Sequence, residues 1–257
     1  MEESTVETPE STANSRSRSS TVYLVLLLVG IGAVAAFLWS RQQKRLEAAE
    51  AAAKPKIQQL GGLVLSGDSG NHVGSVNLAL VRSQENFDQA IKLVSDLPWL
   101  KVLDLTGNSI SGEQLKQVGQ LKELTSLHMA NTTIDDAKAE NLTGLSSLTA
   151  LHAPGTPLTG KSLESIGNLS ALEVLDLSDT QITGDLKPLT QLGKLEWLVL
   201  KNVPLQDESL ENLSKIASLK RLSLTSGQIT AQQYKTLKEQ RPGLSIDGMD
   251  PEEDEPH

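Results

Sequence analysis

The sequence predicts an α/β solenoid, in which short parallel strands form a curved sheet and helices cover its convex side. Two observations carry this prediction. Six segments fit most positions of one pattern of apolar residues, L-x-x-L-x-L-x-x-(N/T)-x-(I/L), with starts 24, 24, 24, 23 and 24 residues apart at Leu100, Leu124, Leu148, Leu172, Leu195 and Leu219. Between them, apolar residues recur at helical spacing. Stacked units of this kind make a long exposed surface rather than a single pocket.

Each repeat begins with a strand. Leu103 and Leu105 are two residues apart, which places both on one face of a strand and leaves Val102, Asp104 and Thr106 on the other. We therefore expect one inward leucine of each repeat to lie on adjacent parallel strands, namely Leu103, Leu127, Leu151, Leu175, Leu198 and Leu222.

A turn follows each strand. Its inward position holds Asn108 in the first repeat and Thr132, Thr156 and Thr180 in the next three. Such side chains can hydrogen-bond turn backbone groups that would otherwise be buried without partners. Val203 and Gly227 stand at this position in the last two repeats, so the sequence predicts that their turns are less well held.

The second half of each repeat has the three-residue spacing of a short helix that packs on the sheet. Parallel strands need a crossover of this kind. The clearest examples are three sets of apolar residues, Leu115, Val118 and Leu121, then Leu163, Ile166 and Leu169, then Leu210, Leu213 and Ile216.

The first repeat, Leu100–Ile110, matches the leucine-rich repeat consensus at every defined position, and the chain resembles this family over roughly two thirds of its length. The similarity is to 24-residue, helix-containing repeats of the bacterial, membrane-anchored type. It implies a non-enzymatic protein that binds a protein or another macromolecule through its concave face.

The ends of the array have degenerate repeats, as terminal caps do. Val73, Val76 and Leu78 occupy the pattern positions of an earlier repeat, and Ile57–Leu65 predicts a short helix, a glycine stop and a first strand. Leu244 and Ile246 predict a closing strand. The repeat domain is therefore expected to cover residues 56–248.

An uncharged apolar segment, Val22–Trp39, precedes the repeats. Eighteen helical residues span about 27 Å, close to the thickness of a bilayer core of about 30 Å. We predict a single-pass, N-terminal transmembrane helix within residues 21–40. The alternative is a signal peptide cleaved after Ala33-Val34-Ala35, but the apolar run continues past that site.

The sequence leaves two alternatives for the side of the membrane on which the repeat domain lies. Five Lys and Arg residues follow the span and two precede it, which favours repeats in the cytoplasm. The resemblance to bacterial surface repeat proteins favours the other side.

The remaining segments predict linkers and tails. Residues 1–20 are expected to be a disordered tail, residues 41–55 a helical stalk that ends near Pro55, and residues 249–257 an acidic disordered tail. Basic and aromatic residues are not arranged for nucleic acid. We expect no cofactor and no small-molecule substrate, since the chain has no Cys and no Gly-x-Ser-x-Gly motif.

One motif suggests an alternative function. Gly155–Ser162 matches the phosphate-binding P-loop pattern, in which Lys161 would reach the outer phosphates and Ser162 would hold magnesium. The repeat register disfavours this reading, because Leu158 is an inward consensus leucine. After the binding protein and the nucleotide-binding protein, a structural envelope protein is the third interpretation.

Two histidines lie at the same outward strand position of successive repeats. His128 and His152, with Asp176 on the next strand, could hold a metal or respond to pH. A solvated polar face is the favoured interpretation, and no metal site is predicted.

Outward apolar residues predict the binding site. Val174, Trp197 and Val199 lie on two adjacent strands, Arg221 lies beside Trp197, and Asp176 lies at the rim. Exposed apolar residues next to Trp and Arg have the composition of a binding hot spot. We therefore assign these five residues to partner binding.

Overall fold

A computed structural model gives the backbone of residues 14–67 and 72–248, and within these ranges it describes the side chains from residue 33 onward. The chain forms two compact units, one that ends at Glu47 and one that begins at Ala48. The first unit contains most of a long helix, α1 (Asn14–Gln59), and the second contains the repeats.

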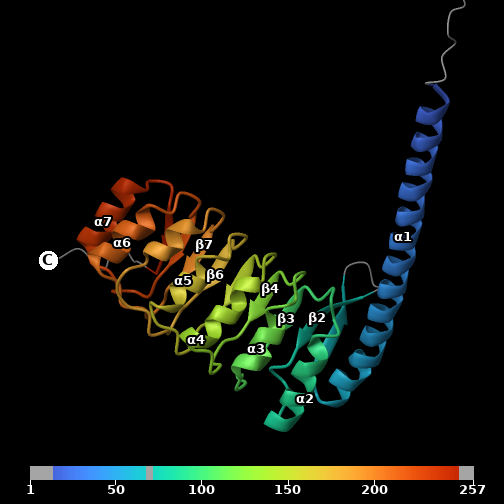
Figure 1. Ribbon diagram of the computed structural model, residues 1–257. Helices are drawn as coiled ribbons and strands as arrows, with labels where there is room; N and C mark the ends of the chain where they lie inside the picture. Colours follow the sequence, from blue (N-terminus) through green and yellow to red (C-terminus); the bar gives the residue numbers. More distant parts are fainter. Residues whose placement is uncertain (1–13, 68–71, 249–257) are drawn as a thin grey trace, which may run out of the picture. The chain divides into compact units, whose positions relative to one another are not determined.

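The repeat unit is built on a sheet whose strands follow one another in sequence order (Figure 1). The strands are β1 (Leu63–Ser66), β2 (Val73–Asn77), β3 (Val102–Asp104), β4 (Ser126–His128), β5 (Ala150–His152), β6 (Val174–Asp176), β7 (Trp197–Val199), β8 (Arg221–Ser223) and β9 (Ser245–Asp247). From β2 onward each pair is parallel.

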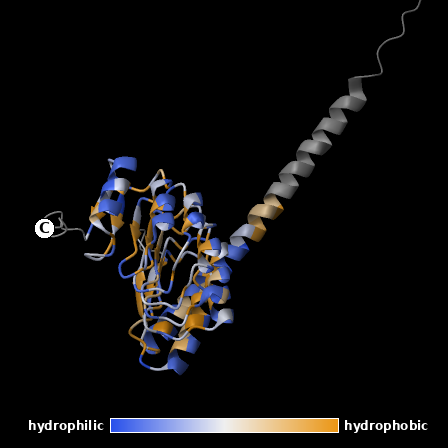
Figure 2. Cartoon of the chain, turned by 90° about the vertical axis from the view of Figure 1, so that its left-hand side faces the viewer, coloured by the Kyte–Doolittle hydropathy of each residue, from blue (hydrophilic) through white to orange (hydrophobic). Residues whose placement is uncertain are grey.

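The predicted register is confirmed. Leu103 pairs with Leu127, and the alignment continues strand by strand to Leu222. Each of these leucines is fully buried. One continuous core thus runs beneath the sheet. Figure 2 colours the residues of the chain by their hydropathy.

Helical segments return the chain on the other side of the core. They are α2 (Gln84–Val94), α3 (Gly112–Val118), α4 (Asp136–Ala139) with the 3-10 helix η1 (Glu140–Gly144), α5 (Ser162–Ile166), the 3-10 helix η2 (Lys187–Gln191), α6 (Asp207–Ser214) and α7 (Ala231–Gln240). The apolar positions that predicted them are buried. The shortest repeat, which begins at Leu172, makes its return with η2 alone.

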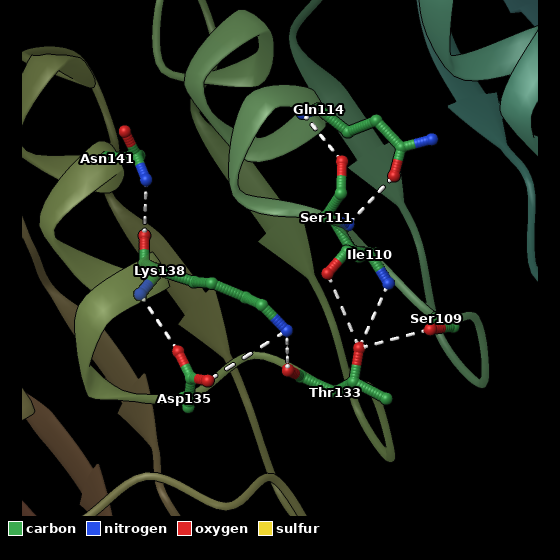
Figure 3. Close-up of polar contacts among 8 residues, drawn as sticks. All are labelled: Ser109, Ile110, Ser111, Gln114, Thr133, Asp135, Lys138 and Asn141. Atoms are coloured by element: carbon green, nitrogen blue, oxygen red, sulfur yellow. Dashed lines mark hydrogen bonds and ion pairs between the residues drawn. The ribbon is translucent and has the colours of Figure 1, made fainter.

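Side chains join successive repeats at the starts of these helices (Figure 3). The Thr133 hydroxyl accepts a hydrogen bond from the Ile110 N–H of the preceding repeat at 3.1 Å. Ser111 and Gln114 form a capping box at the start of α3, and Asp135 caps α4 by accepting from the Lys138 N–H at 3.0 Å. Such caps satisfy N–H groups that a helix leaves free at its first turn.

The predicted hydrogen bonds from the inward Asn and Thr side chains to the turn backbone are confirmed in the first four repeats. The hydroxyls of Thr132, Thr156 and Thr180 donate to the carbonyl three residues earlier, at 2.8, 2.7 and 2.7 Å. The Asn108 amide donates to Leu105 and Thr106 of its own turn and to Leu78 of the preceding repeat.

The prediction of a poorly held turn after Leu195 is wrong. The side-chain amide of Gln228, from the following repeat, donates to the carbonyls of Leu200 and Val203 at 2.7 Å each. Its carbonyl oxygen accepts from the Thr225 N–H at 2.8 Å. One long side chain therefore replaces the missing Asn or Thr, and it serves the turns of two repeats.

The first strand differs from the expectation of an all-parallel sheet, because β1 pairs antiparallel with β2. The spacing of Leu63 and Leu65 predicts a strand but carries no information about its direction. The short connection from Ser66 to Val73 decides it, because a parallel pair would need a crossover of a dozen or more residues.

The expectation that the stalk helix ends near Pro55 is also wrong, since α1 continues to Gln59. Proline removes one helical hydrogen bond, but Ala53 and Ile57 on either side of it are buried in the core of the repeat unit and hold the helix. The helix is terminated at Gly61, whose φ of +98° favours glycine. The next N–H, of Gly62, donates back to Ile57 at 2.9 Å.

A buried carboxylate connects this part of α1 to the start of β2. Glu50 accepts a hydrogen bond from the Val73 N–H and lies 3.1 Å from Nδ1 of His72. The His72 ring in turn stacks on Trp99, with centroids 3.8 Å apart. The end of α1 therefore covers the core at the N-terminal end of the sheet.

The terminal predictions fall mostly outside the described residues. This holds for residues 1–13 of the expected disordered tail, although α1 begins within that tail at Asn14, and for the acidic tail at 249–257. The side chains of the predicted span are described only from residue 33. Within the described residues, no helix has an apolar stretch long enough to cross a membrane.

Candidate functional site

The outward side chains of the sheet form two rows across the strands. The first row consists of Leu65, Ser75, Val102, Ser126, Ala150, Val174, Trp197, Arg221 and Ser245. The second row consists of Leu63, Asn77, Asp104, His128, His152, Asp176, Val199, Ser223 and Asp247. Neighbouring members of a row are about 4.8 Å apart, because that is the spacing of strands in a sheet.

The register brings the five predicted site residues together. Val174 is paired with Trp197, Asp176 with Val199, and Trp197 with Arg221. Val174, Val199 and Asp176 are half-buried, and the Asp176 carboxylate accepts from both the N–H and the hydroxyl of Ser178. Three neighbouring strands therefore supply one continuous patch.

Trp197 is the largest exposed side chain of this patch, with 37% of its surface accessible. The guanidinium carbon of Arg221 lies 5.2 Å from the centroid of its ring, a cation–π distance. The indole Nε1 donates to the Ser223 hydroxyl at 3.0 Å. The ring is thus held in one orientation while much of it faces solvent.

Two residues that the sequence analysis did not assign complete the support of this ring. The Ser223 hydroxyl donates to Oδ2 of Asp247 at 3.1 Å, and the same oxygen lies 3.8 Å from Nε of Arg221. Trp197, Ser223, Asp247 and Arg221 therefore form a closed set across β7, β8 and β9. Both missed residues stand in the second row directly after Val199, a position that the repeat pattern marks as outward.

The histidine pair lies beside this patch. The rings of His128 and His152 stack with centroids 4.5 Å apart and planes 7° apart, and the Ser126 hydroxyl lies 3.1 Å from Nε2 of His128. Burial lowers the pKa of His152, the neighbouring His128 lowers it further, and Asp176 acts in the opposite direction.

The stacked arrangement does not resemble a chelate. Ring nitrogens of two parallel imidazoles point side by side and do not converge on one ion, whereas a zinc site needs ligands at about 2.0–2.1 Å from a common centre. Within the described part of the chain, no three His, Cys, Asp or Glu residues are grouped to hold a metal.

The P-loop-like segment belongs to the repeat turns. The positive φ of Gly155, +67°, recurs at the equivalent positions of other repeats, Gly107, Asn131, Asp179 and Asn202. The Gly155 N–H donates to the Ser178 carbonyl at 2.9 Å, as part of the ladder between repeats. The glycine therefore serves the turn.

The rest of this loop is already hydrogen-bonded within the chain. Asp136 accepts from the N–H and from the hydroxyl of Thr159, at 2.8 and 2.6 Å. The Ser162 hydroxyl donates to the Thr159 carbonyl at 2.7 Å, and Ser162 is buried. A carboxylate held at these donors would repel a phosphate, so the geometry disfavours nucleotide binding.

These strand, turn and helix units define the class of protein as a solenoid of short parallel repeats. Two family profiles match it, "Zer-1-like, Leucine-rich repeats" over residues 163–241 and "Leucine Rich repeat" over residues 96–113. Both profiles describe leucine-rich repeats, so the segments that they match are similar to this family. A search of curated proteins finds no match.

Three solved structures are similar to this chain, and the first of them shows the same fold. An internalin (InlF) from Listeria monocytogenes is 20% identical with a TM-score of 0.51, and the match covers 71% of this chain and 57% of the internalin. A leucine-rich repeat protein of Leptospira interrogans is 24% identical over 61% of this chain and 45% of its own, with a TM-score of 0.45. TLR13, in a complex with ssRNA13, is 22% identical over 56% and 20%, with a TM-score of 0.43.

Proposed function

We propose that this chain is a membrane-tethered, non-enzymatic binding protein that holds a protein partner on the concave face of its repeats. The observation that carries the proposal is the Trp197 ring, which is exposed by 37% and yet fixed by Ser223 and Arg221. Large, rigid aromatic side chains flanked by Arg are typical of the residues that dominate binding energy. A ring that is already ordered loses little conformational entropy when a partner covers it.

The charge of the concave face favours a protein over a nucleic acid. Asp104 and Asp176 lie in the second row, and Asp247 lies beside Arg221. Nucleic-acid sites instead gather Lys and Arg, which neutralise phosphates. The acidic residues along the sheet would repel a phosphate backbone.

The tether is supported by the described part of α1 before residue 40. Phe37, Leu38 and Trp39 are all exposed, by 61, 57 and 65%, and this stretch is the apolar section of the helix in Figure 2. Successive residues of a helix point about 100° apart, so three in a row are apolar on all sides. This favours a helix surrounded by lipid over an amphipathic helix that lies on a surface.

The binding site is tested by comparing partners recovered with the full-length chain in detergent. Wild type, Trp197→Ala and a convex-face control, Lys116→Ala, would be purified in parallel and their bound proteins quantified by mass spectrometry. A partner that is retained by the control and depleted with Trp197→Ala supports the proposal. An identical set of bound proteins for all three variants contradicts it, and recovery of no partner favours a structural envelope protein.

The tether is tested separately by fractionation and N-terminal sequencing. Membrane-bound protein that retains Val22–Trp39 supports an uncleaved anchor. Soluble protein that begins at Ala36 would show that the segment is a signal peptide.

A further inference from the structure

A second apolar patch lies at the opposite end of the concave face from Trp197. Leu63 and Leu65 are exposed by 46% and 52%, while Val64 between them is buried. Their partners on β2 are Asn77 and Ser75, which are outward residues of the two rows. Leu63 and Leu65 therefore point to the same side of the sheet as Trp197.

The described repeat unit has four exposed large apolar side chains, namely Leu63, Leu65, Leu80 and Trp197. Three of them, all except Leu80, belong to the two patches. Leu80 lies three residues beyond Asn77, at the end of β2 where β1 begins. A soluble domain has no packing reason to expose two leucines side by side on a strand, and apolar patches of this kind mark interaction sites.

The side chains between the patches are mostly polar, with Val102 and Ala150 as the exceptions. Six strand spacings separate β1 from β7, which is about 29 Å at about 4.8 Å per strand. The charged carboxylates in the two rows between them are Asp104 on β3 and Asp176 on β6, about 14 Å apart on the same spacing. No Lys or Arg stands in either row between Leu65 and Trp197 among the described residues.

We infer that one protein partner spans the concave face from Leu63 and Leu65 to Trp197. The partner presents a continuous segment about 29 Å long, with an apolar residue near each end and cationic residues between them. The apolar ends bury the two patches, and the cations meet Asp104 and Asp176. This inference rests on the proposed function, because it extends the partner contact at Trp197 to the N-terminal end of the same surface.

Charge complementarity favours this occupant over a membrane surface or a second copy of the chain. Anionic lipids would be repelled by the two carboxylates, and a second concave face would bring like charges together. Cationic residues of a partner would instead speed its association and fix its position along the sheet.

The test uses site-specific photo-crosslinking in the full-length, membrane-bound chain. A photoreactive benzoylphenylalanine would be placed at Leu65, at Val174 or, as a convex-face control, at Lys116, and the crosslinked products identified by mass spectrometry. We expect Leu65 and Val174 to capture the same protein and Lys116 not to capture it.

Substitutions then test the chemistry of the contact. Leu63→Ser with Leu65→Ser should lower the crosslink yield at Val174 about tenfold, as expected for loss of an anchoring contact, while Lys116→Ser with Gln120→Ser leaves it unchanged. Asp104→Asn with Asp176→Asn should also lower the yield and reduce its dependence on salt. Thermal melting verifies that these exposed substitutions leave the fold intact.

Each other outcome identifies what has failed. Capture at Val174 but not at Leu65 overturns the spanning partner and leaves the proposed function standing. Crosslinks from Leu65 to lipid or to a second copy of the chain overturn the assignment of its occupant. No capture at either position overturns the proposed function as well.

Discussion

The Gln228 side-chain amide lies 2.7 Å from the carbonyl oxygen of Leu200 in the preceding repeat. It donates a second hydrogen bond to Val203 at the same distance, and so takes the place of the Asn or Thr of earlier turns. A single surface-proximal residue thus holds the segment that directly follows the Trp197 strand.

Gln228→Ala should therefore destabilise the fold. The substitution leaves the Val203 carbonyl without its donor and the Leu200 carbonyl with only the Val203 N–H at 3.2 Å, and an unpaired buried group costs about 1–3 kcal/mol. Urea unfolding measures the change, with the exposed Gln240→Ala as a control. Equal stability of the two variants would show that water replaces the Gln228 amide without loss.

Leu175→Ala should be strongly destabilising. Leu175 is fully buried between Leu151 and Leu198 on the neighbouring strands, and truncation of such a leucine costs about 2–5 kcal/mol. The adjacent outward residue supplies the control, because Val174→Ala should cost far less. A loss below about 1 kcal/mol for Leu175→Ala would contradict the inward assignment.

Trp197→Ala should affect binding more than stability. Loss of a central anchor weakens binding by about 2 kcal/mol or more, whereas the lost hydrogen bond to Ser223 contributes only about 0.5–1.5 kcal/mol to folding. Calorimetry of partner binding and urea unfolding measure the two effects. Trp197→Phe keeps an aromatic ring but has no N–H, so it distinguishes the contribution of apolar contact area from that of the hydrogen bond to Ser223. The reverse result, with stability lost and binding kept, would place the binding site elsewhere.

The histidine stack should make stability fall in mild acid. The folded-state pKa of His152 is lowered below its usual 6.5, first by burial and then by His128. Below about pH 6.5 the unfolded chain therefore binds more protons than the folded chain, and stability decreases as the pH falls towards the folded-state pKa. Unfolding free energies from about pH 8 to pH 5 should decline less for His152→Gln than for the wild type. Identical pH profiles would rule out this contribution.

The Gly155 loop should not respond to nucleotide. Lys161→Ala should leave partner binding unchanged, and ATP with magnesium should not raise the melting temperature. A true site at about 100 times its Kd would add about 2.7 kcal/mol of stability. A magnesium-dependent rise that is lost with Lys161→Ala would contradict the structural assignment of this loop.

The sequence predicts the repeated part of the fold well because its information is local and periodic. Leu103 and its equivalents recur at a nearly fixed step, and this step determines both the strand register and the face of each side chain. The neighbourhood of Trp197 follows from the same register, since Val174 and Arg221 occupy equivalent positions of adjacent repeats.

Features without a period escape prediction. The direction of β1 depends on a short connection, and the continuation of α1 past Pro55 depends on burial of Ala53 and Ile57. The amide of Gln228 reaches across repeats to a carbonyl 28 positions away. Leu63 and Leu65 fit a strand pattern, and only the pairing with Ser75 and Asn77 shows which face they occupy.

Gln228 also couples unfolding of the last repeat to unfolding of the repeat before it. Repeats contact only their neighbours, so an array can fray from an end one unit at a time. When the segment around α7 detaches, Gln228 leaves with it, and the segment after β7 loses its donor while the N-terminal repeats stay folded. A protease would then cut first near the C-terminus, and a bound partner would slow that cleavage by fastening the last repeats together.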